Sequence, residues 1–121
     1  IFAEQAAALV KAGADLLYIE TMAALDEVQA AIEGARRAGP DIPVFATLSF
    51  DTHGRTNMGV RPEQAAEVLS GLEVTAFGAN CGATLEMTAG ALEKMHQAAP
   101  DAILIAKPNA GTPRMVGQQV V

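Results

Sequence analysis

Cysteine, aromatic residues and basic residues are all scarce in this sequence. The chain has 121 residues and one cysteine, which excludes an internal disulfide framework and favours a reducing, cytoplasmic compartment. Aromatic residues make up 4% and tryptophan is absent, so alanine and small aliphatic residues have to form the core. Fourteen acidic residues against eight basic ones give a formal net charge of −6. This balance argues against the basic surface that binds nucleic acid or an anionic membrane.

Long apolar runs and targeting signals are also missing. No apolar stretch reaches the roughly 18 residues that a membrane-spanning helix needs, and no signal peptide is recognisable. Half of the residues are apolar and only 18% are charged, which excludes a disordered chain. The sequence starts at Ile1 in the middle of a helical pattern. We therefore expect residues 1–121 to be one partial domain, a segment of a longer protein.

Four apolar runs with strand character recur along the chain at intervals of roughly thirty residues, about the length of one βαβ step. They lack apolar–polar alternation, which predicts strands buried on both faces, as in a parallel sheet. The runs cover residues 15–19, 43–48, 74–79 and 102–106. Helical patterns precede and separate them, so the order is α-βα-βα-βα-β. This order predicts an α/β fold, either an open doubly wound sheet or about half of a (β/α)8 barrel.

The helical segments show apolar stripes that predict which residues face the sheet. After a first helix over residues 1–11, the three stripes consist of Leu25, Val28, Ile32 and Ala35, then Ala65, Val68, Leu69 and Leu72, then Leu85, Ala89, Leu92 and Ala99. His96 lies beside the last stripe and is predicted to pack there, whereas His53 belongs to a solvated turn. Residues 111–119 are predicted to form an extended loop.

Polar residues gather where the predicted strands end, whereas the strand starts carry short turns. The clusters are Glu20–Thr21, Ser49–Asp51, Asn80–Gly82 and Lys107–Asn109. Active sites of barrels and of doubly wound sheets lie at this carboxyl edge. The asymmetry indicates an enzyme. No glycine-rich phosphate-binding fingerprint occurs, which argues against nucleotide chemistry in this segment.

Three residues at this edge each have a functional and a structural interpretation. Cys81 is either a small buried residue or a zinc-binding thiolate, whose further ligands would have to come from outside this sequence. Glu20 is either a binder of a ligand ammonium group or a charge that favours the dipole of the following helix. Lys107 is either a lysine at the rim of the sheet or the Schiff-base lysine of an aldolase-type barrel enzyme.

The motifs at the strand ends resemble those of the homocysteine S-methyltransferase domain, found in betaine–homocysteine methyltransferases and in cobalamin-dependent methionine synthase. Order and spacing agree over nearly the whole chain. The stretches that carry the resemblance are Ala12–Met22, Ser49–Asp51 with Gly54–Thr56, Gly78–Gly82 and Pro108–Gly111. The resemblance implies a (β/α)8 barrel of which these are strands four to seven.

The resemblance also implies roles for individual residues. Cys81 would be one of three zinc-binding thiolates, the other two belonging to a paired-cysteine motif that is absent here. Glu20 would bind the amino group of homocysteine. Asn80 and Gly82 would present polar groups to metal or substrate, and Asn109 would shape the pocket. None of these residues is expected to act as a catalytic acid or base.

The implied reaction moves a methyl group to the thiol of homocysteine to give methionine. Zinc would deprotonate and hold the thiol, which is a poor nucleophile when protonated. The implied partners are homocysteine and a methyl donor, namely betaine, methylcobalamin or an S-methyl sulfonium compound. A half barrel also leaves two sheet edges open, so the alternative is a non-catalytic segment that self-associates or needs a partner half.

Overall fold

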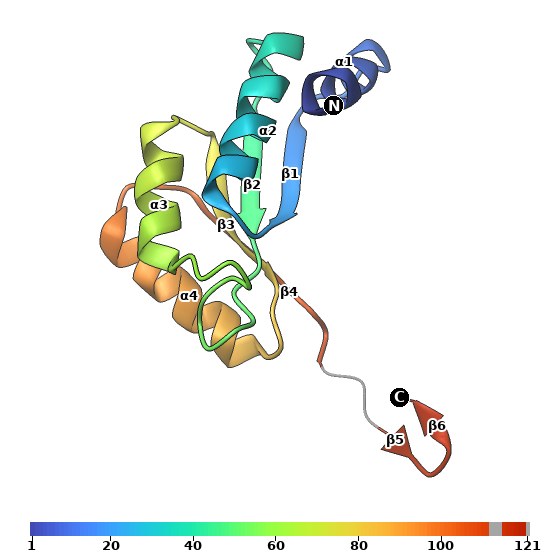
Figure 1. The fold of residues 1–121 in the computed structure, drawn as a ribbon, viewed down its shortest axis with the longest axis vertical. Coiled ribbons are helices and arrows are strands. Elements are labelled where there is room, and N and C mark those ends of the chain that lie inside the picture. The colour runs from blue at the N-terminus through green and yellow to red at the C-terminus, as the bar shows by residue number, and fades with distance from the viewer. Residues whose placement is uncertain (112–114, 121) are drawn as a thin grey trace.

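The computed structural model describes residues 1–111 and 115–120. Its main feature is a four-stranded, fully parallel sheet in the order β1-β2-β3-β4 (Figure 1). The strands are β1 (Leu17–Met22), β2 (Val44–Leu48), β3 (Ala76–Cys81) and β4 (Leu104–Pro108). Because each strand pairs with the next one along the chain, every crossover advances the sheet in the same direction. This is how a barrel wall is built.

One helix precedes the first strand and one connects each pair of neighbouring strands (Figure 1). Parallel strands joined by right-handed crossovers place all connecting helices on the same face of the sheet. The helices are α1 (Phe2–Lys11), α2 (Leu25–Ala38), α3 (Pro62–Gly71) and α4 (Leu85–Ala98). The predicted alternation of helices and strands and the α/β fold are therefore confirmed.

The core lies between the sheet and the helices and is made of small residues and a few large ones. Val28 and Ile32 of α2 and Leu69 of α3 are buried against the strands, as their stripes predict. The prediction of strands buried on both faces holds for β2 and β3 only. Half or more of the residues of β1 and β4 are partly or fully exposed, because these strands form the two edges of the sheet.

The predicted burial of the fourth helix is wrong in part. Thr88, Ala91 and Met95 are the buried residues of α4, whereas Leu85 is 58% exposed and Ala89 is exposed as well. The reason is that the Thr88 hydroxyl donates to the carbonyls of Cys81 and Thr84, 3.4 Å away in each case. A search for apolar residues alone misses a polar residue on the buried face. His96, predicted to pack, is exposed.

Two boundaries also differ from the prediction. Three of the four strands begin two residues later than expected, so that Glu20, Asn80 and Lys107 lie inside the strands and not beyond them. The tail, predicted as an extended loop, contains a small antiparallel hairpin of β5 (Met115–Val116) and β6 (Gln119–Val120). Its turn includes Gly117 at a φ of 64°, a conformation that glycine adopts readily. Residues 112–114 of this predicted loop lie outside the described residues.

Alternation along the strands separates their side chains into two faces. Tyr18 and Glu20 of β1 point to the face opposite the helices, and Tyr18 pairs in register with Phe45. Thr47, two residues after Phe45, lies on the same face and pairs with Gly78 of β3. Asn80, two residues after Gly78, pairs with Lys107 of β4, so Lys107 lies on this face as well. We call this the open face: it carries Tyr18, Glu20, Phe45, Thr47, Ile105 and Lys107. In a closed barrel this face would line the interior.

Among the residues that the structure describes, no helix combines the length and the apolar character that crossing a membrane would require.

Candidate active site

The ends of β1 and β3 share an unusual backbone conformation. Thr21 has a φ of 63° and Cys81 a φ of 57°, values in the left-handed region that residues other than glycine rarely adopt. At Thr21 the pairing of β1 with β2 shifts register, between Ile19 and Met22. Strained backbone of this kind persists where surrounding contacts hold it, and it is concentrated at functional sites.

Asn80 provides the contacts that hold both strand ends. Its side-chain oxygen accepts a hydrogen bond from the Thr21 backbone nitrogen at 3.1 Å, and its nitrogen donates to Thr21 Oγ1 at 2.6 Å. The same nitrogen lies 3.2 Å from Cys81 Sγ, to which it donates. Asn80 is only 2% exposed. Its amide therefore joins the end of β1 to the end of β3 across the intervening strand.

A second set of contacts fixes the turn that follows Cys81. Gly82 is buried with a φ of 76°, and a Cβ atom there would lie 2.7 Å from Thr88 Oγ1. The Asn109 side-chain nitrogen donates to the Gly82 carbonyl at 3.2 Å, and the Asn109 backbone nitrogen donates to the Cys81 carbonyl at the same distance. The predicted residues Asn80, Cys81, Gly82 and Asn109 thus form one hydrogen-bonded group.

Glu20 meets Lys107 on the open face. Glu20 Oε1 accepts a hydrogen bond from Lys107 Nζ at 2.5 Å, and Lys107 Nζ lies 5.5 Å from the centroid of the Tyr18 ring. The Tyr18 hydroxyl in turn lies 3.2 Å from Thr47 Oγ1, and Thr47 is fully buried. Because β1 and β4 are opposite edges of the sheet, this ion pair bridges the whole width of the open face.

The environment of Lys107 argues against an aldolase-type reaction. The hydrogen bond that Lys107 donates to Glu20 has the largest effect and raises the pKa of Lys107 above its ordinary value; partial burial opposes this rise, and the charge of the Glu20 carboxylate adds to it. A Schiff-base lysine has to lose its proton to attack a carbonyl, which a lowered pKa assists. The shift of the Lys107 pKa runs in the opposite direction.

Cys81 has the chemistry of a zinc ligand but stands alone in this chain. Its side chain is half-buried at the carboxyl edge, and the Asn80 N–H donates to its sulfur, as it would to a thiolate. Within residues 1–111 and 115–120, no three or more histidine, cysteine, aspartate or glutamate side chains lie close enough together to hold a metal ion. The described residues around Cys81 therefore offer a single thiol and not a complete set of metal ligands.

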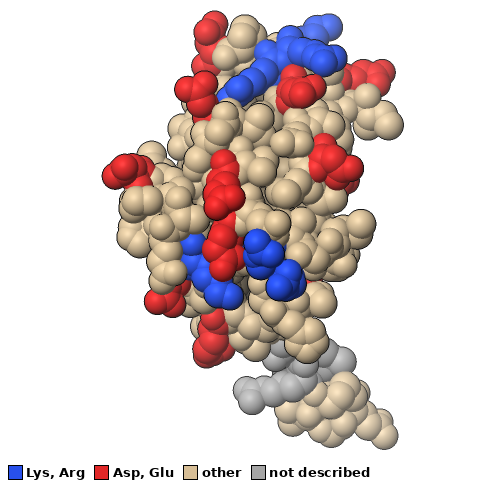
Figure 2. All heavy atoms as spheres, turned by 60° about the vertical axis from the view of Figure 1, so that its left-hand side comes forward, with Lys and Arg blue, Asp and Glu red and all other residues tan. Residues whose placement is uncertain are grey.

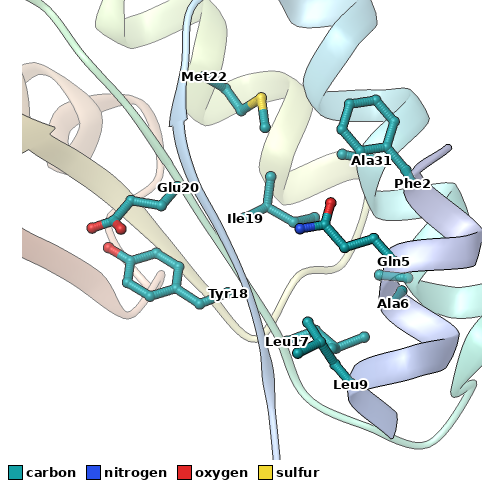
Figure 3. A pocket seen from close by; sticks show the side chains of 11 residues that line it. Phe2, Gln5, Ala6, Leu9, Leu17, Tyr18, Ile19, Glu20, Met22 and Ala31 are labelled. Carbon is teal, nitrogen blue, oxygen red and sulfur yellow. The ribbon is translucent and has the colours of Figure 1, made fainter. Parts of the chain in front are cut away.

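A hollow of about 280 Å³ lies on the other side of β1, and the residues that line it include Tyr18 and Glu20 (Figure 3). Phe2, Gln5 and Leu9 of α1 line it together with Leu17 and Ile19 of β1. Figure 3 shows that the side chains of Tyr18 and Glu20 point away from α1, toward the open face. Their polar ends therefore belong to the open face and not to the hollow.

The charged surface agrees with the composition. In Figure 2 the basic side chains of the visible face lie in separate groups with acidic side chains around and between them.

The sequence interpretation assigned no role to Thr21, Tyr18 or Thr56. Thr56 is 1% exposed, donates to the Ala23 carbonyl at 2.6 Å and accepts from the Val60 nitrogen, so it ties the loop after β2 to the loop after β1. Only alternation along β1 hints at Tyr18, since it lies two residues before Glu20. No sequence signal identifies Thr21 as the partner of Asn80, because 59 positions separate them.

Comparison with known proteins finds relatives by sequence and by structure. Methionine synthases from Mycobacterium tuberculosis and Mycobacterium leprae are 31% and 30% identical to this chain over 118 residues. That alignment covers 93% of this chain but only 10% of each synthase. The apo crystal structure of the homocysteine methyltransferase MmuM from Escherichia coli superposes with a TM-score of 0.73 at 29% identity, over 90% of this chain and 44% of MmuM.

The four-stranded parallel sheet is thus a barrel-like segment of the homocysteine methyltransferase fold, and the chain spans less than half of each of these proteins. The family model described as homocysteine S-methyltransferase matches residues 1–121, the whole length of this chain. The chain therefore belongs to the homocysteine S-methyltransferase family.

Proposed function

We propose that residues 1–121 are the homocysteine-binding part of a zinc-dependent methyltransferase and act within a longer polypeptide as part of its barrel domain. The observation that carries this proposal is the amide of Asn80, which hydrogen-bonds both Thr21, next to Glu20, and the sulfur of Cys81. A carboxylate for an amino group and a thiolate for a metal are thereby held at one edge of the sheet. Homocysteine carries an amino group and a thiol in one small molecule.

The proposed metal ligand in this chain is Cys81. Zinc, when bound, lowers the pKa of a coordinated thiol and keeps the thiolate in place at neutral pH. Asn80 supports this role because its N–H donates to Cys81 Sγ and restrains the sulfur. Asn109 and Gly82 support it by holding the strained backbone around Cys81 through their hydrogen bond.

The proposed reaction is an in-line displacement. The homocysteine sulfur forms a bond to the methyl carbon, the bond between methyl and donor breaks, and its electron pair leaves with the donor. We propose betaine, methylcobalamin or an S-methyl sulfonium compound as the donor. The proposed role of Glu20 is to bind the substrate ammonium and so orient the sulfur toward the methyl group, which is where much of the rate enhancement would arise. Asn80, Gly82 and Asn109 are proposed to shape the substrate pocket beside it.

Glu20→Gln tests the proposed amino-group site. The change keeps the shape of the side chain but removes its charge, so the binding free energy of the substrate is expected to weaken by about 1.5–3 kcal/mol. We expect the KM for homocysteine of the complete protein that contains these residues to rise roughly 10- to 100-fold. Glu33→Gln is the matched control, because Glu33 pairs with Arg37 at 3.5 Å on the exposed surface of α2. An unchanged KM in Glu20→Gln would remove Glu20 from the binding site.

The isolated 121-residue chain is expected to bind zinc weakly and to form no methionine. The reason is that Cys81 is its only cysteine, whereas a tight zinc site uses three or four protein ligands. Equilibrium dialysis against zinc and an assay of methionine formation check this expectation. Gel filtration of the same sample tests the proposed self-association through the free edges of β1 and β4. Turnover by the isolated chain would contradict the proposal that it needs the rest of a barrel.

A further inference from the structure

The ion pair between Glu20 and Lys107 has an unusual position for a surface contact. The two residues lie on opposite edge strands, and their side chains meet above the open face. The Tyr18 ring lies 5.5 Å from Lys107 Nζ, an arrangement in which the aromatic face attracts the ammonium. Lys107 is thereby directed toward Glu20, the residue proposed to bind the substrate amino group.

Both members of the pair keep binding capacity beyond this contact. A carboxylate has two oxygens with about four acceptor positions, and an ammonium has three N–H donors. In the structure the pair uses one oxygen, Oε1, and the side chains of Lys107 and Glu20 are 59% and 38% exposed. A ligand with one positive and one negative group can therefore contact both residues from solvent. An α-amino acid is such a ligand, because its ammonium and carboxylate are attached to the same carbon.

We propose that Lys107 is a specificity-determining residue that binds the carboxylate of the amino acid substrate while Glu20 binds its ammonium. This assignment rests on the proposed function, since it takes Glu20 as the amino-group site. In the absence of substrate the two side chains neutralise each other. When the substrate binds, Glu20 and Lys107 each give up part of their contact with one another and form a charge-assisted hydrogen bond to the substrate. The pair thus selects a zwitterion over a simple thiol, amine or acid.

The competing interpretation is that Lys107 only neutralises and orients Glu20. The two interpretations differ in the ligand that a lysine variant should affect. Two analogues of homocysteine separate them: 3-aminopropane-1-thiol lacks the carboxylate, and 4-sulfanylbutanoate lacks the amino group. Loss of a carboxylate site weakens only ligands that carry a carboxylate. Loss of orientation at Glu20 weakens only ligands that carry an ammonium.

The test compares Lys107→Gln with the unaltered complete protein by isothermal titration of homocysteine and both analogues. We expect the Kd of 4-sulfanylbutanoate and of homocysteine to rise about tenfold, the loss of one charge-assisted hydrogen bond. The Kd of 3-aminopropane-1-thiol is expected to stay constant or to fall, because Glu20 is released from its partner. Lys107→Arg is expected to restore part of the loss, and Lys94→Gln on the exposed surface of α4 serves as the control.

Two results would overturn the assignment in distinguishable ways. If Lys107→Gln weakens 3-aminopropane-1-thiol and leaves 4-sulfanylbutanoate unchanged, or changes neither, Lys107 is no carboxylate site even though the protein methylates homocysteine. If the unaltered protein forms no methionine from homocysteine with any of the three donor classes, the proposed function itself fails, and the assignment of Lys107 fails with it.

Discussion

Gly78→Ala is expected to lower the free energy of unfolding by about 3 kcal/mol or more, at the upper end of what overpacking costs. Gly78 lies in the middle of β3 and pairs with Ile105 of β4. A Cβ atom at Gly78 would lie 2.0 Å from the Ile105 carbonyl oxygen and 2.7 Å from its nitrogen. Both are backbone atoms, so no side chain can rotate away. The two strands would have to separate, and the hydrogen bonds that place Lys107 beside Asn80 would be lost.

Thermal and urea unfolding of the Gly78→Ala variant and of the unaltered chain measure this effect. Gly90→Ala is the matched control, because Gly90 lies within α4 and a Cβ atom there meets nothing within 4 Å. The same substitution is expected to stabilise that helix by about 0.5–1 kcal/mol, since alanine has the higher helix propensity. A lower free energy of unfolding for Gly78→Ala and a higher one for Gly90→Ala would support the steric argument. Equal stability of Gly78→Ala and the unaltered chain would show that β3 and β4 are not as close as described.

Asn80→Ala is expected to destabilise the chain by about 3 kcal/mol, because it removes three partly buried hydrogen bonds, each contributing about 1 kcal/mol. The Thr21 backbone nitrogen and Oγ1 and the Cys81 sulfur each lose a hydrogen bond. Thr21 and Cys81 also lose the contact that stabilises their left-handed backbone. The ends of β1 and β3 would then be free to relax, and Glu20 and Cys81 would lose their fixed relation.

A double-mutant cycle separates these effects. Thr21→Ala removes the hydroxyl group that accepts from Asn80, together with the γ-methyl group of this exposed residue, so we expect a loss of about 1 kcal/mol. If Asn80 and Thr21 act through each other, the double variant is less destabilised than the sum of the single variants. Asn57→Ala in the exposed loop after β2 controls for the loss of an asparagine side chain. Strict additivity in the cycle would show that the hydrogen bond between the Asn80 and Thr21 side chains contributes nothing to stability.

The order of helices and strands could be predicted from local patterns, because each element carries its own signal. Runs of small aliphatic residues between glycine and proline turns marked the four strands, and the stripes around Val28 and Leu69 marked two of the helix faces correctly. Strand ends were predicted less well. Hydropathy located β1 too early, because Glu20 and Thr21 are polar and yet belong to the strand. Backbone pairing, and not side-chain polarity, sets where a strand ends.

The grouping of polar residues at one edge could also be predicted, but their contacts could not. Parallel strands bring their carboxyl ends together whatever the side chains are, so Glu20, Cys81 and Lys107 were expected at one edge. That Lys107 would meet Glu20 depends on the curvature that brings β4 toward β1. That Asn80 would turn inward to Thr21 depends on the register shift at the end of β1.

The amino-acid sequence by itself determined the α/β alternation and the edge at which the polar motifs lie, because these follow from spacing along the chain, and the motifs themselves carried the family resemblance. Only the tertiary structure decided that Asn80 joins two strand ends and that Lys107 faces Glu20 across the sheet. Both contacts join residues more than fifty positions apart. Their geometry depends on strand register and sheet curvature, which arise from the packing of the whole sheet and leave no local pattern in the sequence.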